Sequence, residues 1–414
     1  MKRASFLIVA VVWAAGCAAS PRASAPVLLE GAGSVAPPAQ PPARESSEAA
    51  RYREDARSIG PLVDRVYAYL DRFEGGRAPI SATLRAEAEQ VTDRQTLTRY
   101  AERVLLSLAD HHAITGSSLG DSWAVVPSYA DVWVVEEGGV YSIDAVRKGT
   151  PAEEAGLRRG DRISSVDDVP IGEAVSAFWD DLGLPVTGER AAFAARILAA
   201  GRRDRGRRIG VVRDGGTRVL DLPSLYATPV RERSPVTVTE EGGSLVLRIN
   251  DSLGDASTIT AFDTALAGAA VGEPVVIDLR NTPGGGNTTV ARAILGWFVD
   301  RPRAYQVHNR PGEGRTTGIA RQWVEQVLPR PGKHHDGPVR VLVGRWTGSM
   351  GEGLAVGFDA IGADVRGERM AGLLGAIVDH RLEHSGLMIK LPTERLMHVN
   401  GAPREHYEPR PAGP

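Results

Sequence analysis

Cysteine and lysine are both scarce in this chain of 414 residues. Cys17 is the only cysteine, so no disulfide can form within the chain. Of its 49 basic residues only four are lysines, namely Lys2, Lys148, Lys333 and Lys390. The formal net charge of −2 excludes a bulk field that would steer the protein to nucleic acid or acidic lipid, so we expect no nucleic-acid partner. Chemistry that needs a lysine therefore has few candidates.

Apolar runs long enough to span a bilayer as a mature helix are also missing. The run FLIVAVVWAA follows Lys2 and Arg3 and ends at Ala-Ala-Gly-Cys17, which resembles the bacterial lipoprotein cleavage box. An ordinary signal peptide with an incidental cysteine is the alternative. We predict a lipoprotein signal peptide over residues 1–17 and lipidation of Cys17. The protein would then be anchored in the bacterial cell envelope, on the periplasmic face or the cell surface, and would meet the membrane only through its lipid.

The chain is too long for one hydrophobic core and fits two or three domains. Residues 18–48 are rich in Ala, Pro, Ser and Gly, which predicts a flexible linker. Residues 49–125 show helical spacing of apolar residues, residues 131–225 contain short strand-like runs, and residues 230–414 alternate strands with helices, which indicates an α/β sheet. The expected helices are 59–73, 99–108, 258–270, 288–299 and 350–361, and the expected strands are 132–135, 140–146, 162–166, 208–212, 217–222, 244–249, 274–279 and 339–343.

The stretch KGTPAEEAGLRRGD, between two of these strands, predicts a very short helix. Thr150 is a suitable N-cap, Pro151 suits the first helical position, and Glu153 would complete a capping box. The stretch resembles the PDZ signature, which implies a PDZ-like, β-rich domain over residues 131–225. The segment 173–203 is longer than a minimal PDZ domain requires.

One strand-turn-helix corner has the sequence VLVGRWTGSMGE and places Ser349 at the start of a helix. Free backbone N–H groups at such a point can bind an oxyanion, and the helix dipole favours negative charge there. Ser349 is therefore a candidate nucleophile, with the N–H of Met350 as an oxyanion donor. The alternative is that Ser349 only caps the helix, a common role for serine. Glu352 is expected to interact with the helix N-terminus rather than with substrate.

A second corner, VIDLRNTPGGG, places three glycines directly after a buried strand. Glycines allow backbone N–H groups to approach a substrate closely. The alternatives are a tight loop or a phosphate-binding loop, but neither the Walker lysine nor the GxGxxG spacing is present.

Together the corners resemble the C-terminal-processing (tail-specific) serine peptidase family, including its tricorn-core branch, with the hallmarks DLRxNxGG and SASxSE. They stand here as DLRNTPGGG and TGSMGE, in the same order. With the PDZ-like segment, the resemblance covers roughly residues 100–410. It implies a ClpP/crotonase-like α/β core with Ser349 as the nucleophile. The N–H groups of Gly284 or Gly285 and of Met350 would form the oxyanion hole.

The general base departs from the commonest pattern of that family, which uses a lysine in GExTxGKG. The matching stretch is GERMAGLLG, and Leu373 stands where the lysine should be. Lys390 is the only lysine after Ser349, and it lies in an apolar strand pattern. A serine/lysine dyad is therefore disfavoured, with Lys390 kept as its one candidate.

The tricorn-type branch uses a histidine in a segment like LxDxHT, supported by a glutamate near the C-terminus. The segment LADHHA matches, and the resemblance gives His112 the role of base and leaves His111 where the tricorn core has a serine. Histidine suits this role because its ordinary pKa lies near neutral pH. The alternative for His112 is a histidine that binds the last carbonyls of a helix. Glu405 is the candidate support, with Glu408 as the second choice.

These residues predict a serine endopeptidase that cleaves unfolded or tail-exposed polypeptides without a cofactor. By family resemblance, the PDZ-like domain would bind the C-termini of substrates. The spacing of His380 and His384 is sometimes seen in metal sites, but no further ligands accompany them, so no metal site is expected. The alternative function is a catalytically inactive peptidase fold that serves as a peptide-binding or scaffold lipoprotein.

Overall fold

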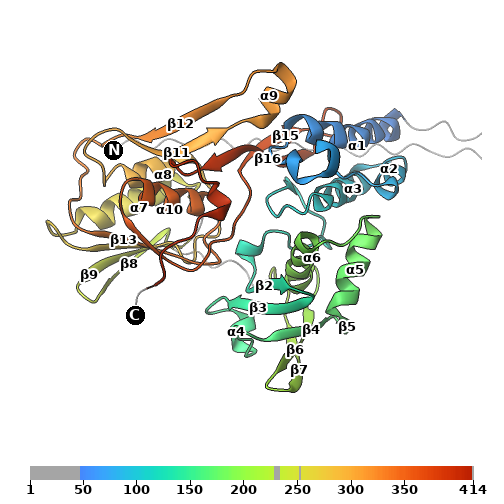
Figure 1. Ribbon diagram of the computed structural model, residues 1–414, viewed down its shortest axis with the longest axis horizontal. Helices are drawn as coiled ribbons and strands as arrows, with labels where there is room; N and C mark the ends of the chain where they lie inside the picture. The colour runs from blue at the N-terminus through green and yellow to red at the C-terminus, as the bar shows by residue number, and fades with distance from the viewer. Residues whose placement is uncertain (1–46, 228–233, 251–252, 413–414) are drawn as a thin grey trace, which may run out of the picture. The chain divides into compact units, whose positions relative to one another are not determined.

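The computed structural model describes residues 47–227, 234–250 and 253–412 (Figure 1). The predicted signal peptide, Cys17 and nearly all of the predicted linker lie outside the described residues. Within these three ranges, no helix combines the length and apolarity that a membrane crossing requires.

The N-terminal region is helical, as predicted, but its helix bounds differ from the expected ones. The first helix begins earlier and ends at Val66 instead of residue 73, because the chain turns at Tyr67, whose hydroxyl donates to the buried Asp110 (2.7 Å). Asp93 caps a later helix by accepting from the N–H of Thr96 (2.8 Å). The elements are α1 (Ser47–Val66), η1 (Leu70–Arg72), η2 (Glu74–Gly76), α2 (Ala82–Ala88) and α3 (Arg94–Ser107).

The next region is an antiparallel sheet with the order β2-β3-β4-β6-β7, and β5 pairs with β4. Its strands fall where they were predicted, to within two residues at each end, except for the two-residue strand β5, which was not predicted. The segment that a minimal PDZ domain does not need forms the two helices α5 and α6, which pack on each other. The elements are η3 (Pro127–Tyr129), β2 (Val132–Glu137), β3 (Val140–Val146), α4 (Pro151–Glu154), β4 (Arg162–Val166), β5 (Val169–Pro170), α5 (Ile171–Asp181), α6 (Gly188–Ala200), β6 (Arg207–Arg213) and β7 (Gly216–Leu222).

The predicted capping box at α4 does not form, because Thr150 and Glu153 bind other backbone groups than the prediction requires. Pro151 does occupy the first helical position. The hydroxyl of Thr150, however, donates to the carbonyl of Arg147 (2.6 Å), and the carboxylate of Glu153 accepts from the N–H of Gly149 (2.7 Å). The turn before the helix uses these side chains because its own backbone groups need partners.

The C-terminal region contains the predicted α/β sheet, with the order β14-β13-β10-β9-β8. Neighbouring strands are parallel except for the edge strand β8, which pairs antiparallel with β9. Ile277 pairs with Val341 in the centre of the sheet, and both are fully buried. The elements are β8 (Val236–Glu241), β9 (Ser244–Ile249), α7 (Ala256–Ala267), β10 (Val275–Asp278), α8 (Thr288–Leu295), β13 (Val339–Val343), α10 (Met350–Ala360) and β14 (Asp364–Gly367).

A second sheet in this region was not predicted. Its order is β1-β16-β11-β12, with β15 as a third partner of β16, and helix α10 contacts both this sheet and the parallel one (Figure 1). Strand β1 lies only a few residues after α3, so its pairing with β16 joins the N-terminal region to the C-terminal region. The elements are β1 (Ile114–Thr115), β11 (Arg303–Asn309), α9 (Pro311–Thr317), β12 (Gln322–Val327), β15 (Ala376–Arg381), β16 (Met388–Met397) and η4 (Arg404–His406).

A buried ion pair anchors the start of the antiparallel sheet. The guanidinium of Arg207 binds the carboxylate of Asp131, and the two side chains are 1% and 3% exposed. Arg207 also donates to the carbonyl of Ala199 at the end of α6 (2.8 Å). Removing one partner of such a pair leaves a buried charge without compensation, which is far more costly than losing an exposed pair.

We therefore expect Arg207→Met to lower the free energy of unfolding by about 3–5 kcal/mol. The neighbouring Arg208 forms exposed ion pairs, so Arg208→Met should change the free energy of unfolding by about 1 kcal/mol or less. Urea unfolding followed by tryptophan fluorescence measures both variants. Equal effects of the two substitutions would contradict the assignment.

Candidate active site

Ser349 lies in a strained turn between strand β13 and helix α10. Its φ of 50° and ψ of −113° fall in a region that residues other than glycine rarely adopt. Met350, the next residue, begins the helix, so Ser349 stands at the positive end of the helix dipole. A strained serine at a strand-turn-helix corner is the geometry that holds a nucleophile out of the sheet.

The glycine-rich corner after β10 lies directly against this serine. The N–H of Gly348 donates to the carbonyl of Thr282 (3.0 Å) and the hydroxyl of Thr347 donates to that of Leu279 (2.8 Å). A Cβ at Gly284 would lie 3.0 Å from the Cβ of Ser349, and the φ of Gly284 is 127°. Glycine at this position is therefore required both by the close approach and by the backbone conformation.

Three backbone amides at the junction of the two corners are free to bind an anion. The N–H groups of Gly284, Gly285 and Met350 donate to no acceptor among the described residues. The family resemblance predicted the N–H of Gly284 or Gly285 and that of Met350 for the oxyanion hole. Free amides near a serine hydroxyl can stabilise the charge that develops on a carbonyl oxygen under attack.

Glu352 holds the backbone of the nucleophile to the loop before strand β15. Its buried carboxylate accepts from the N–H groups of Ser349 (2.7 Å), Gly372 (2.8 Å) and Leu373 (3.2 Å). Glu352 thus interacts with the start of its own helix, as expected. Burial raises its pKa to about 7, although the guanidinium of Arg404 and these amides oppose the shift.

His112 lies beyond the end of α3 and faces the same loop. Its Nδ1 lies 2.7 Å from the carbonyl oxygen of Leu374, and its backbone N–H donates to Asp110 (2.8 Å). A carbonyl can only accept, so Nδ1 carries the proton and Nε2 keeps a free lone pair. Burial lowers the pKa of His112 to about 4, and the positive charge of Arg404 contributes. The imidazole is therefore neutral at neutral pH and can accept a proton at Nε2.

His111 differs from His112 in every contact. Its Nδ1 lies 2.6 Å from the carbonyl oxygen of Val125, its Nε2 accepts from the guanidinium of Arg196 (2.9 Å), and its ring stacks on Phe193. Both ring nitrogens are thus occupied, and burial keeps the pKa of His111 well below its ordinary value. His111 has a structural role.

Arg404 connects the nucleophile segment to the segment that holds His112, and the sequence analysis missed it. It is 2% exposed and donates to the carbonyls of Ser349 (3.3 Å), Leu373 (2.7 Å) and Gly375 (3.0 Å). The last two carbonyls flank the one that His112 binds. The only available signal was its position next to Glu405, and nothing in the sequence distinguishes this arginine from the many others.

Neither predicted glutamate contacts the imidazole. Among the described residues, no carboxylate oxygen lies within 4.0 Å of a ring nitrogen of His112, and the carbonyl of Leu374 occupies the position predicted for the glutamate. Glu405 lies near Tyr69, where burial and then the charge of Glu405 raise the pKa of the phenol, and Glu408 is exposed. Direct orientation of His112 by either carboxylate is therefore not observed, and a support role for Glu405 stays a prediction.

The structure gives the lysine alternative no support. Lys390 lies on β16, where its ammonium pairs with the carboxylate of Asp379 (2.8 Å) on β15. Leu373, at the position of the family lysine, is buried, and only its backbone reaches Glu352. Among the described residues, no group of three or more His, Cys, Asp or Glu side chains could hold a metal ion, and His384 pairs with Glu54 (2.9 Å).

The segment before β2 forms hydrogen bonds to the glycine-rich corner, and the sequence did not predict this contact. The hydroxyl of Ser128 donates to the carbonyl of Pro283 (2.5 Å), and that of Tyr129 donates to the carbonyl of Gly284 (3.1 Å). These bonds fix two successive carbonyls of the corner. A serine and a tyrosine in a three-residue 3-10 helix give no signal in the sequence for such a role.

Comparisons with known proteins agree with the fold. Residues 245–410 match the model of peptidase family S41, and residues 142–177 match a PDZ domain. The structure of mature CPAF complexed with lactacystin is 15% identical, covers 88% of this chain and 94% of that chain, and has a TM-score of 0.55. The photosystem II D1 C-terminal processing protease is 18% identical, with coverages of 87% and 93% and a TM-score of 0.52. No curated protein matches the chain.

Fold, site and family match together define a serine-type peptidase. Residues 245–410 are an S41 peptidase domain, and residues 142–177 belong to a PDZ domain.

We expect Arg404→Met, which retains the aliphatic stem, to lower kcat by about 10²-fold, because the nucleophile and the His112 loop lose their common donor. Removing the charge should also raise the pKa of His112, so the acid limb of the pH–rate profile should move to higher pH. Activity of the purified variant on an unfolded protein, measured across pH, tests both effects.

The matched control is Arg410→Met, since Arg410 is exposed and, among the described residues, its side chain forms an ion pair with Asp364 alone (3.4 Å). It should leave the rate and the acid limb unchanged. If Arg404→Met lowers the rate but the acid limb of the pH–rate profile stays at the same pH, Arg404 has only a structural role.

Proposed function

We propose that this chain is an endopeptidase that cleaves unfolded or tail-exposed polypeptides, with Ser349 as nucleophile and His112 as general base. The observation that carries the proposal is the strained Ser349 placed against the free amides of the glycine-rich corner. The neutral imidazole of His112, fixed by the carbonyl of Leu374, supports the choice of base.

The proposed reaction has two steps. Ser349 Oγ attacks the scissile carbonyl carbon while its proton passes to Nε2 of His112, and the amides of the two corners bind the oxyanion. The C–N bond breaks as the imidazolium protonates the leaving amine, which leaves an acyl-enzyme. Water then attacks the ester with the same histidine as base and releases the carboxylate product.

Two further proposals concern binding and location. The PDZ domain would bind the C-termini of substrate chains, by strand addition with carboxylate capture. The sequence Ala-Ala-Gly-Cys17 would direct lipidation, so the enzyme would be held at a membrane of the bacterial cell envelope. Radiolabelled fatty acid incorporated by the wild-type chain, and not by Cys17→Ser, is the expected result.

Substitutions at the site separate this enzyme from a binding scaffold. Ser349→Ala and His112→Ala should each abolish degradation of an unfolded protein, because one removes the nucleophile and the other the base. Lys390→Ala should keep most of the activity, because its ammonium only pairs with Asp379. Gel assays with equal amounts of folded protein measure all three. Loss of activity in Lys390→Ala but not in His112→Ala would restore a serine/lysine mechanism, and inactivity of the wild type would favour the scaffold.

The pH profile tests the identity of the base. A histidine whose pKa is lowered to about 4 stays unprotonated above that pH, so kcat/KM should fall only as the pH drops through about 4. A limb near pH 7 that disappears in Glu352→Gln would instead reflect the titration of Glu352. A limb near pH 6.5 that survives in Glu352→Gln would mean that His112 is solvated, which contradicts the site described above. Circular dichroism at each pH controls for unfolding.

A further inference from the structure

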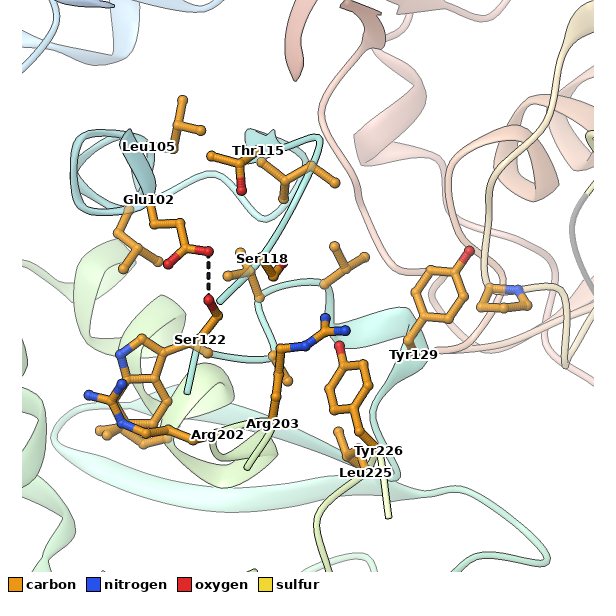
Figure 2. Close-up of a pocket in the computed structure, with 18 of the residues that line it drawn as sticks. Glu102, Leu105, Thr115, Ser118, Ser122, Tyr129, Arg202, Arg203, Leu225 and Tyr226 are labelled. Atoms are coloured by element: carbon orange, nitrogen blue, oxygen red, sulfur yellow. Dashed lines mark hydrogen bonds between the residues drawn. The ribbon is translucent and has the colours of Figure 1, made fainter. Parts of the chain in front are cut away.

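A large cavity opens beside the glycine-rich corner (Figure 2). Its volume is about 1440 Å³, and its walls come from α3, α5, the segment before β2, the loop after β3 and the residues that follow α6. Asn281 and Pro283 of the corner line it, as does Tyr129, whose hydroxyl binds the carbonyl of Gly284. A polypeptide bound at the corner would therefore continue into this cavity.

The lining of the cavity carries an excess of positive charge. Six of the described lining residues are basic and three are acidic, although the whole chain has a formal net charge of −2. Burial raises the pKa of Glu102, which adds to the imbalance, and Asp181 is paired with Arg103. The basic residues are Arg99, Arg103, Arg147, Lys148, Arg202 and Arg203, and the acidic ones are Glu102, Glu154 and Asp181.

Two of these arginines are held by aromatic rings instead of carboxylates. The guanidinium of Arg203 lies 3.8 Å from the ring centroid of Tyr226, and that of Arg202 lies 4.1 Å from the ring of Trp123. Neither has a carboxylate oxygen within 4.0 Å among the described residues. Figure 2 shows Arg203 and Tyr226 together at the cavity. Stacking on a ring fixes a guanidinium without neutralising it, so both charges remain available to a ligand.

We propose that this cavity binds acidic stretches of polypeptide substrates, through the side-chain carboxylates of Asp and Glu. The role of this binding in cleavage rests on the proposed function of Ser349. The cations on α3 are paired with carboxylates, and the remaining cations lie in two separate places on the wall, after β3 and after α6. One terminal carboxylate would engage only one of these places, whereas a run of acidic side chains can meet both.

Binding is tested with the full chain carrying Ser349→Ala, so that no cleavage interferes. The probes are fluorescent ten-residue peptides that contain either three Glu or three Gln, each with a free or an amidated C-terminus. The Glu peptides should bind about tenfold more tightly than the Gln peptides whatever the terminus, and added salt should reduce the difference. Equal binding of Glu and Gln peptides, or a preference that depends only on the free terminus, would overturn the proposal.

Substitutions locate the preference within the chain. Arg203→Gln should weaken binding of the Glu peptides about threefold, and Arg203→Glu should abolish the preference for Glu over Gln. The control is Arg218→Glu, on β7, which is exposed and does not line the cavity. An equal loss in this control would assign the effect to net charge and would contradict a cavity site.

Cleavage assays with the active chain separate this inference from the proposed function. If the Ser349→Ala protein prefers Glu peptides but the wild-type protein cleaves no polypeptide, the peptidase proposal fails and the cavity assignment stands. If the wild type cleaves Glu and Gln substrates with equal kcat/KM and binds them equally, the cavity assignment fails and the peptidase proposal stands.

Discussion

The close contact between the two strand-end corners is the constraint on which the rest of the site depends. Ser349 can be presented to free amides only because Gly284 lacks a side chain and adopts a φ of 127°, which allows the backbone to approach to within contact of the serine Cβ. Parallel pairing of β10 with β13 brings both corners to the same edge of the sheet. The strain at Ser349 persists because the surrounding hydrogen bonds of Thr347, Gly348 and Glu352 hold the turn on both sides.

Around this contact, backbone groups take positions that side chains occupy in peptidases with a Ser-His-Asp triad. The imidazole of His112 is oriented by a carbonyl, and Arg404 and Glu352 hold the surrounding loop through backbone carbonyls and amides. A carbonyl fixes the tautomer as well as a carboxylate does, but it stabilises the imidazolium less because it carries only a partial charge. Burial lowers the pKa of His112, the charge of Arg404 adds to this shift, and the hydrogen bond to the carbonyl of Leu374 opposes it only in part.

Much of the fold followed from local patterns in the sequence. Strands β3, β4, β9 and β13 have the predicted bounds, because alternating or continuous apolar residues between turn residues leave little choice. The second sheet was not predictable in the same way. Its strands contain buried polar residues such as Gln306 and His308, and they pair across long stretches of sequence that no local pattern connects.

The sequence by itself determined the two corners, because the type and spacing of residues such as Gly284 and Ser349 are local properties of a strand followed by a turn and a helix. The family resemblance predicted His112 as the general base, because Leu373 stands where the family lysine should be and cannot take a proton, and it left Lys390 as the alternative. Only the tertiary structure decided what orients that histidine. The carbonyl of Leu374 and the guanidinium of Arg404 reach the site through contacts between segments that are distant in the sequence. Every residue has a backbone carbonyl, so the residue type does not indicate which carbonyl will bind the imidazole.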